Sequence, residues 1–226
     1  MFSRIEKMLN SKEIVKIQKL NILLVGVGGV GGYTLEMLVR SGVINITIID
    51  ADTIDISNLN RQIITNQSNI GAKKVDIAKE RCLNINPKCD IKTIDIFLTK
   101  ENINILENNH YDYIVDACDT ITTKIALIKY SRDNDCKIIS SMGTGNKLDP
   151  SKLEIINLKK TAYDPLAKAV RQILRKENIN INVMCICSKE IPRNIESRTP
   201  GSLALVPSSA GILCASYIIN DCISKE

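Results

Sequence analysis

The 226-residue sequence predicts an α/β protein with a doubly wound, mostly parallel sheet. Short aliphatic runs of strand length alternate with segments of helical periodicity as far as residue 145. A glycine-rich segment stands between the first of these runs and the helical segment that follows it. The alternation becomes irregular after residue 145, so we expect extra strands and helices at the C-terminal end.

The expected strands are runs rich in isoleucine, leucine and valine. Residues 21–25 are almost uniformly apolar, as is typical of a strand buried on both faces of a parallel sheet. Gly42 ends the helix that follows, and the next strand begins two residues later. The full set of expected strands is 21–25, 44–50, 91–97, 111–116, 137–141, 153–158 and 181–187.

The expected helices lie between these runs. The opening segment has apolar residues spaced among charged ones and predicts one helix or two short ones, whereas the third helix stops at Pro87. Residues 188–201 contain two prolines and no periodicity, which predicts a mobile loop. The expected helices are 2–19, 33–41, 71–86, 100–108, 120–134, 164–177 and 208–223.

The cysteine and histidine content excludes several kinds of chemistry. Eight cysteines occur without any C-x-x-C pair, and His110 is the single histidine, so we expect no zinc site. One histidine also leaves little room for Ser-His-Asp or Cys-His catalysis. We therefore expect most of the thiols to be small buried groups in the core.

The distribution of charge and hydropathy predicts a cytoplasmic protein. No run approaches the roughly 18 apolar residues of a membrane span, and charges begin at Arg4, which does not fit a signal peptide. The net charge of +5 permits a polyanionic partner without requiring one. With 24% charged and 44% hydrophobic residues, the composition is that of a globular protein.

The glycine-rich segment predicts a nucleotide site. Its glycines, between a buried strand and a helix, allow a tight turn and a close approach of the backbone to phosphate, as in Rossmann-like sheets. Asp50 ends the second strand, where a carboxylate commonly binds the ribose hydroxyls. These features alone do not distinguish NAD, FAD and ATP. The glycines assigned to the loop are Gly26, Gly28, Gly29 and Gly31.

Two cations and an acid after the second strand favour ATP. Arg61 and Lys74 can neutralise a triphosphate and a departing pyrophosphate, which hydride transfer does not require. Asp119, at the carboxyl end of a strand, can hold Mg²⁺. A carboxylate that attacks the α-phosphorus is already ionised at neutral pH, so no general base is needed. The pattern therefore suits adenylate formation.

The segment from Asp50 onwards resembles the ThiF/MoeB/HesA superfamily of ubiquitin-activating-type adenylyltransferases. The resemblance rests on D-x-D at 50–52, S-N-L-x-R-Q at 57–62, G-x-x-K at 71–74 and D-x-x-D at 116–119. The resemblance implies the ATP site of this superfamily, in which Asp52 and Asn58 join the glycine loop, Asp50, Arg61, Lys74 and Asp119 as nucleotide contacts. It also implies a homodimer in which Arg4 reaches the partner subunit's site.

The second half resembles the tRNA threonylcarbamoyladenosine dehydratase family. The matching stretches are residues 142–150, 160–168, 187–190 and 200–202. Some members carry a cysteine just before the final helix, where this chain has Ser208 and Ser209, so a thiol-dependent step there lacks support. A single domain, 1–226, follows, with an N-terminal helical arm (1–20), a nucleotide-binding core (21–145), and C-terminal substrate-binding and closing elements (146–226).

The resemblance implies a ligase-type cyclisation that consumes ATP and releases AMP and pyrophosphate. The threonyl carboxylate of threonylcarbamoyladenosine in the tRNA anticodon loop is adenylated, and the carbamoyl nitrogen then closes a five-membered ring. Well-placed intramolecular attack has effective molarities of about 10⁵–10⁸ M, so positioning suffices for the second step. A sulfurtransferase-type partner and a monovalent cation near Asp149 are further expectations.

A basic stripe on the helix after Asp164 is a candidate tRNA contact. Lys168, Arg171 and Arg175 recur at spacings of three and four residues, so they lie on one face of the helix. The solvent-exposed face of an ordinary amphipathic helix explains the same pattern. The sequence leaves both interpretations open.

Two other functions compete with the tRNA cyclase. One is activation of the C-terminus of a ubiquitin-like sulfur-carrier protein, but that branch usually has two C-x-x-C zinc pairs, which this chain lacks. The other is a non-catalytic nucleotide-binding protein, against which Arg61, Lys74 and Asp119 argue.

Overall fold

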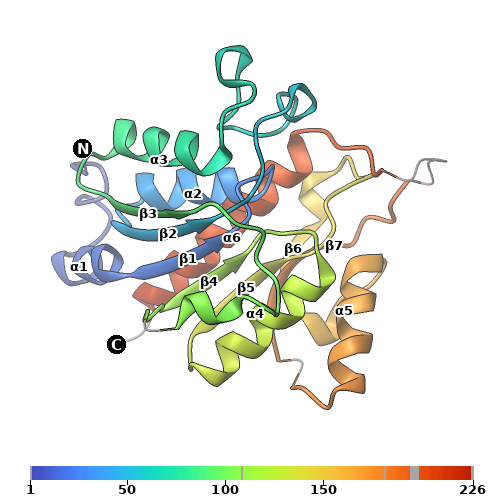
Figure 1. Ribbon diagram of the computed structural model, residues 1–226. Helices are drawn as coiled ribbons and strands as arrows, with labels where there is room; N and C mark the ends of the chain where they lie inside the picture. The colour runs from blue at the N-terminus through green and yellow to red at the C-terminus, as the bar shows by residue number, and fades with distance from the viewer. Residues whose placement is uncertain (1, 108, 181, 194–198, 225–226) are drawn as a thin grey trace.

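A seven-stranded sheet forms the centre of the computed structural model, which describes residues 2–107, 109–180, 182–193 and 199–224 (Figure 1). The strand order is β3-β2-β1-β4-β5-β7-β6, and β6 alone of these strands runs antiparallel to its neighbour. The predicted doubly wound, mostly parallel α/β fold is confirmed. The strands are β1 (Asn21–Val25), β2 (Asn45–Ile49), β3 (Asp90–Ile94), β4 (Tyr113–Asp116), β5 (Lys137–Ser141), β6 (Leu153–Asn157) and β7 (Met184–Ser188).

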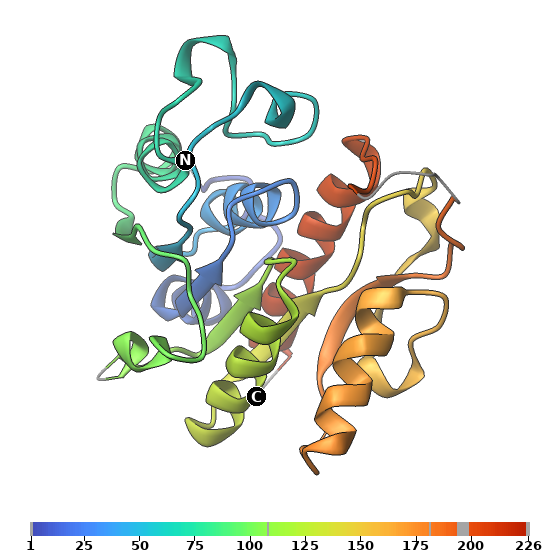
Figure 2. The same ribbon diagram turned by 45° about the vertical axis from the view of Figure 1, so that its right-hand side comes forward.

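Helices cover both faces of the sheet (Figures 1 and 2). One face carries α1, α2, α3 and α6, and the other carries α4 and α5. Right-handed crossovers between parallel strands produce such a three-layer arrangement. The helices are α1 (Ser11–Lys19), α2 (Gly31–Arg40), α3 (Lys74–Ile85), α4 (Ile121–Asp133), α5 (Pro165–Lys176) and α6 (Leu205–Ile223).

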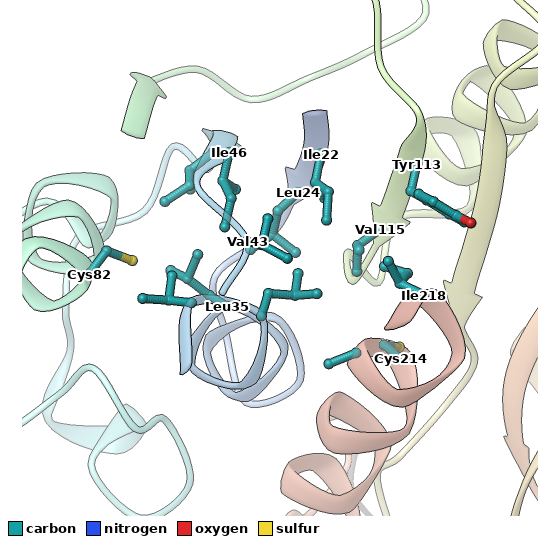
Figure 3. Packing of buried hydrophobic residues seen from close by; sticks show 14 of the residues in the cluster. Ile22, Leu24, Leu35, Val43, Ile46, Cys82, Tyr113, Val115, Cys214 and Ile218 are labelled. Atoms are coloured by element: carbon teal, nitrogen blue, oxygen red, sulfur yellow. The ribbon is translucent and has the colours of Figure 1, made fainter. Parts of the chain in front are cut away.

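Strand β1 shows why its sequence is apolar without alternation. Ile22 and Leu24 point into the cluster beneath α2 and α6, whereas Leu23 and Val25 point into the cluster beneath α4. Figure 3 shows the first of these clusters, where Ile218 of α6 faces the strands. Both faces of the strand are therefore removed from water, as the central strand of a doubly wound sheet requires.

The chain ends and element boundaries differ from the sequence predictions. Residues 3–9 form turns, and α1 begins only at Ser11, where the Asn10 side chain accepts hydrogen bonds from the backbone in a capping box. The expected helix 100–108 is one 3₁₀ turn, η3 (Ile103–Leu106), and residue 108 lies outside the described part. Of the expected loop 188–201, residues 194–198 also lie outside it, as does residue 181 of an expected strand.

Helix α6 starts three residues earlier than expected and includes Pro207 in its first turn, where the missing proline N–H costs no helical hydrogen bond. By length and composition it could cross a membrane, contrary to the expectation that no run was long enough. However, Ala210, Cys214 and Ile218 are buried against α2 and the sheet. A Cβ at Gly211 would lie 2.3 Å from the Val30 carbonyl oxygen, so α6 packs closely on α2 as a core helix.

A buried carboxylate joins α2 to α3. Glu36 accepts hydrogen bonds from Arg81 Nε at 2.6 Å and from Arg40 Nε at 2.7 Å, and its side chain is 3% exposed. Burial alone raises the pKa of a glutamate, but the hydrogen bonds and charges of Arg81 and Arg40 lower the pKa of Glu36 below its ordinary value. Folding therefore favours the ionised form of this residue.

We expect Glu36→Gln to lower the free energy of unfolding at neutral pH by about 1.5–3 kcal/mol, the usual contribution of charge-assisted hydrogen bonds. Because the folded pKa lies below the unfolded value of about 4.3, this stabilisation is complete above pH 4.3 and is lost as pH falls through the folded pKa. Urea unfolding at pH 7 and at pH 3 measures both effects. A difference between the two proteins that does not shrink in acid would contradict the assignment.

Candidate functional site

A cleft of about 340 Å³ lies at the carboxyl ends of the central strands. The chain leaves β1 toward β2 on one side and reaches β4 on the other, so strand order reverses at this point. Ligands of open α/β sheets bind at such a switch point. The cleft is lined by all the predicted nucleotide contacts except Gly31, namely Gly26, Gly28, Gly29, Asp50, Asp52, Asn58, Arg61, Lys74 and Asp119.

Close backbone contacts determine the shape of the glycine loop. Gly26 has φ +90°, and a Cβ there would lie 2.9 Å from the Ala117 carbonyl oxygen. A Cβ at Gly31 would lie 1.8 Å from the Gly26 carbonyl oxygen. Gly31 thus lets α2 begin directly against the loop, and it is not among the residues that line the cleft. Gly28 has open space, with Gln62 Nε2 3.8 Å from an added Cβ.

The Asp50 carboxylate is held by two backbone donors. Its Oδ2 accepts a hydrogen bond from Val27 N at 2.7 Å, and its Oδ1 accepts one from Asp52 N at 2.9 Å. The acid is therefore fixed relative to the glycine loop. Each carboxylate oxygen retains a lone pair for another donor, such as a ribose hydroxyl.

The predicted cations lie on the cleft wall formed by the chain after β2. Lys74 is 4% exposed, and its Nζ lies 2.6 Å from Asp52 Oδ2. Arg61 Nη1 donates to the Ser57 carbonyl oxygen at 2.8 Å and to Asn60 Oδ1 at 2.9 Å. Asn58 is buried, and its Oδ1 accepts from Asp55 N at 3.0 Å. Two held cations thus face a glycine loop, an arrangement suited to polyphosphate.

A buried ion pair that the sequence analysis missed lies next to the cleft lining, beside Ala117 and Thr123. Lys124 Nζ lies 3.0 Å from Asp116 Oδ2 and donates to the Ser141 carbonyl oxygen at 2.7 Å. Both side chains are 0% exposed, and Ser140 also donates to Asp116. Although burial lowers the pKa of a lysine, the Asp116 carboxylate raises the pKa of Lys124 overall. A lysine on the sheet-facing side of an expected helix was the available signal.

Cys118 lines the cleft but is a poor nucleophile. Burial, followed by the Asp116 carboxylate 3.0 Å from its Sγ, raises the pKa of the thiol well above its ordinary value. The thiolate is the reactive form, so this cysteine stays inert at neutral pH. The other seven cysteines are free and buried, which confirms that most thiols belong to the core.

The C-terminal half completes the cleft with residues that sequence reasoning did not select. Thr144 follows β5, Ser202 lies before the start of α6, and Pro207 lies in its first turn. The loop after β5 is supported by a buried ion pair, in which Lys147 Nζ lies 2.7 Å from Asp164 Oδ2 and donates to the Gly143 carbonyl oxygen at 2.6 Å. The sequence signal for Thr144 and Ser202 was their position in stretches shared with the dehydratase family, and Pro207 lies outside those stretches.

Asp119 is the exposed acid at the end of β4, where its carboxylate lines the cleft. Oxygen donors of this type suit Mg²⁺. Among the residues that the structure describes, no group of three or more histidine, cysteine or acidic side chains is arranged to hold a metal. Asp149, near which a monovalent cation was expected, accepts a hydrogen bond from Ser151 N at 3.0 Å.

The predicted RNA contacts and Arg4 lie away from the cleft lining. Lys168 and Arg175 are exposed on α5. Arg171 is half-buried and donates to the carbonyl oxygen of Thr161 at 2.9 Å, so it holds the chain before α5 instead of forming part of a free stripe. Arg4 is exposed in the N-terminal turns.

A doubly wound sheet with this glycine loop, acid and pair of cations at its switch point defines a nucleotide-binding α/β protein. The chain belongs to the ThiF family, whose model matches residues 3–220. A tRNA threonylcarbamoyladenosine dehydratase of Bacillus subtilis is 38% identical, over 97% of this chain and 93% of the relative. The dehydratase of Escherichia coli is 32% identical, over 95% and 78%.

Solved structures match along the same length. The crystal structure of E. coli tRNA N6-threonylcarbamoyladenosine dehydratase in complex with ATP has a TM-score of 0.92 and 30% identity, and covers 99% of this chain and 93% of that one. The complex with AMP has a TM-score of 0.91. An adenylyltransferase and sulfurtransferase of Vanderwaltozyma polyspora is 34% identical, but over 64% of this chain and 32% of the relative.

We expect Gly31→Ala to abolish ATP binding and lower the melting temperature, because the new methyl group overlaps the Gly26 carbonyl oxygen that shapes the loop. Gly28→Ala is the matched control for folding, since its methyl group meets no backbone atom within 4 Å. Thermal unfolding and ATP calorimetry compare the two variants. Equal melting temperatures would show that the contact at Gly31 is not tight.

Proposed function

We propose that this protein is an ATP-dependent tRNA threonylcarbamoyladenosine dehydratase, which converts the tRNA nucleoside to its cyclic form. The observation that best supports this proposal is the cleft, where Arg61, Lys74 and Asp119 face the glycine loop. The chain that forms this cleft is similar to dehydratases along nearly its full length. The ATP named in the complex of the E. coli relative matches a site built for a polyphosphate. Because tRNA is the proposed substrate, we expect the protein to act in the cytoplasm.

The first step is transfer of AMP to the substrate carboxylate. The carboxylate oxygen attacks the α-phosphorus, and the bond to the bridging oxygen of pyrophosphate breaks. The glycine loop and Asp50 bind the nucleotide, while Arg61 and Lys74 neutralise charge on the triphosphate and the leaving group. Lys74 suits this role because its ammonium is buried and already oriented by Asp52. Asn58 lines the same wall of the cleft as Arg61 and Lys74.

The second step is ring closure. The carbamoyl nitrogen attacks the activated acyl carbon, a proton leaves that nitrogen, and AMP departs with one carboxylate oxygen. No protein nucleophile is required, which fits the inert thiol of Cys118. The protein contributes chiefly by holding the reacting groups together.

Asp119 would hold Mg²⁺, because an exposed carboxylate at the cleft suits a hard cation with oxygen ligands. When bound, this ion offsets the negative charge of the triphosphate. Calorimetry of Asp119→Asn with ATP, with and without Mg²⁺, tests the role. A sulfurtransferase-type partner that assists the enzyme remains part of the proposal.

We propose a single domain, 1–226, that acts as a homodimer. The N-terminal turns pack at the end of α2 distant from the glycine loop, since Phe2 lies 3.8 Å from a Cβ built at Gly42. A helix of 10 residues spans roughly 15 Å, so Arg4 lies far from its own cleft. A second subunit can bring its own Arg4 to the triphosphate.

The direct test is conversion of the nucleoside by the purified protein. Threonylcarbamoyladenosine-containing tRNA and ATP–Mg²⁺ are incubated with it, and the nucleosides are analysed by mass spectrometry. The expected result is loss of one water, with AMP and pyrophosphate as products. ATP–pyrophosphate exchange that depends on a small carrier protein, and not on tRNA, would overturn the proposal.

We expect Arg4→Ala to reduce turnover by about 10³-fold or more, as for arginines that stabilise phosphoryl transition states, while ATP affinity changes little. Mixing Arg4→Ala with Lys74→Ala subunits then restores activity, because each mixed dimer keeps one complete site. Mass spectrometry of labelled subunits verifies their exchange. If exchange occurs without recovery, Arg4 does not act across the dimer.

For tRNA binding we expect Lys168→Glu with Arg175→Glu to weaken affinity and to flatten the slope of log K against log salt by roughly 0.7–0.9 per lost phosphate contact. Both side chains are exposed, so folding and ATP affinity are unaffected. Arg171→Glu is the contrasting variant, expected to destabilise the fold because it removes an internal donor. An unchanged salt slope in the double variant would leave α5 a solvated helix.

A further inference from the structure

A short chain segment crosses the cleft between its two walls. We define the strap as residues 199–203, which precede α6 and contribute Ser202 to the cleft lining. One end is fixed by Asn146, whose N–H donates to the Gly201 carbonyl oxygen at 2.8 Å and whose Oδ1 accepts from Gly201 N at 2.7 Å. Asn146 has φ +58°, a conformation that asparagine tolerates better than most residues.

The other anchor of the strap is Asn60, on the nucleotide side of the cleft. Its Nδ2 donates to the Ser202 carbonyl oxygen at 2.8 Å, although the two residues are 142 positions apart. Its Oδ1 accepts from Arg61 Nη1 at 2.9 Å. One amide therefore connects the guanidinium proposed for the triphosphate to the segment that closes the substrate side.

We propose that Asn60 is a positioning residue that aligns the strap, and with it the tRNA nucleoside, relative to the nucleotide-binding Arg61. The inference rests on the proposed dehydratase function. Asn60 holds the variable position of the S-N-L-x-R-Q motif, so the motif does not assign it a role. Ser202 of the strap and Thr144 both line the cleft, and their hydroxyl groups offer donors to the incoming acyl group.

The two hydrogen bonds of Asn60 can be separated by a substitution of the same shape. Asn60→Asp keeps an acceptor for Arg61 but presents an oxygen to the Ser202 carbonyl oxygen, so only the strap contact is lost. Asn146→Gly removes the side-chain acceptor of Gly201 N without adding charge and keeps the backbone hydrogen bond to the Gly201 carbonyl oxygen, and glycine accepts the positive φ without strain. Asn66→Asp is the charge control, because Asn66 uses its Oδ1 to accept from Ser68 N in a loop outside the cleft lining.

We expect Asn60→Asp and Asn146→Gly each to raise the KM for tRNA about 3- to 10-fold, in line with the loss of one hydrogen bond, with the Kd for ATP changed less than about 2-fold. Amide hydrogen exchange at Gly201 accelerates in both variants. Because both substitutions release the same strap, the double variant is no worse than the more affected single variant. Asn66→Asp leaves the KM, the Kd and the exchange rate unchanged.

The inference is overturned if the single variants keep the KM of the parent protein, or if their effects multiply in the double variant. It is also overturned if Asn60→Asp alters ATP affinity alone. Failure of the parent protein to cyclise the nucleoside would instead remove the proposed function. In that event, an unchanged rate of amide hydrogen exchange at Gly201 in the Asn60→Asp variant still contradicts the proposed link between Asn60 and the strap.

Discussion

The buried pair of Asp116 and Lys124 supports the cleft from below. Two opposite charges without solvent contact are costly to separate, since removal of one partner commonly costs about 3–5 kcal/mol. The pair joins the end of β4 to α4 and, through Ser140 and Ser141, to the end of β5. These strand ends lead directly into the loops that carry Asp119 and Thr144. The parts of the cleft around Asp119 and Thr144 therefore depend on one ion pair.

The cleft unites two kinds of surface. The chain after β1 and β2 supplies a glycine loop, an acid and two cations, all of which line the cleft. The chain after β5 and before α6 supplies hydroxyl groups, and the first turn of α6 supplies a proline. Pro207 lies close to the glycine loop, because a Cβ at Gly29 would approach its Cβ to 3.3 Å. The substrate side is thus packed directly on the phosphate loop, which favours attack on a phosphate held there.

Much of the nucleotide side could be predicted from sequence because its signals are local. A buried strand, glycines and a helix follow each other within about ten residues, and Asp50 ends the next strand. The substrate side depends on contacts between distant segments, such as Asn60 with Ser202, and no local pattern reports them. The same limit explains Arg171, which lies on the expected face of α5 but meets the chain around Thr161 there.

Local patterns also left the packing role of Gly31 unrecognised and misplaced the start of α6. A glycine that permits close packing and one that faces phosphate look alike in sequence, and only the Gly26 carbonyl oxygen beside Gly31 separates the two. The final helix was expected from residue 208, yet α6 begins at Leu205, because a proline in the first turn loses no helical hydrogen bond. In both cases the structure, and not the residue type, decides the role.

Isotope transfer tests the central claim, adenylation of the substrate carboxylate, most directly. Threonylcarbamoyladenosine-containing tRNA carrying ¹⁸O in both oxygens of the threonyl carboxylate is incubated with the protein and ATP, and AMP is analysed by mass spectrometry. Attack by the carboxylate on the α-phosphorus, followed by ring closure, predicts that each AMP formed contains one ¹⁸O atom. AMP without the label, formed alongside the cyclic nucleoside, would contradict the account.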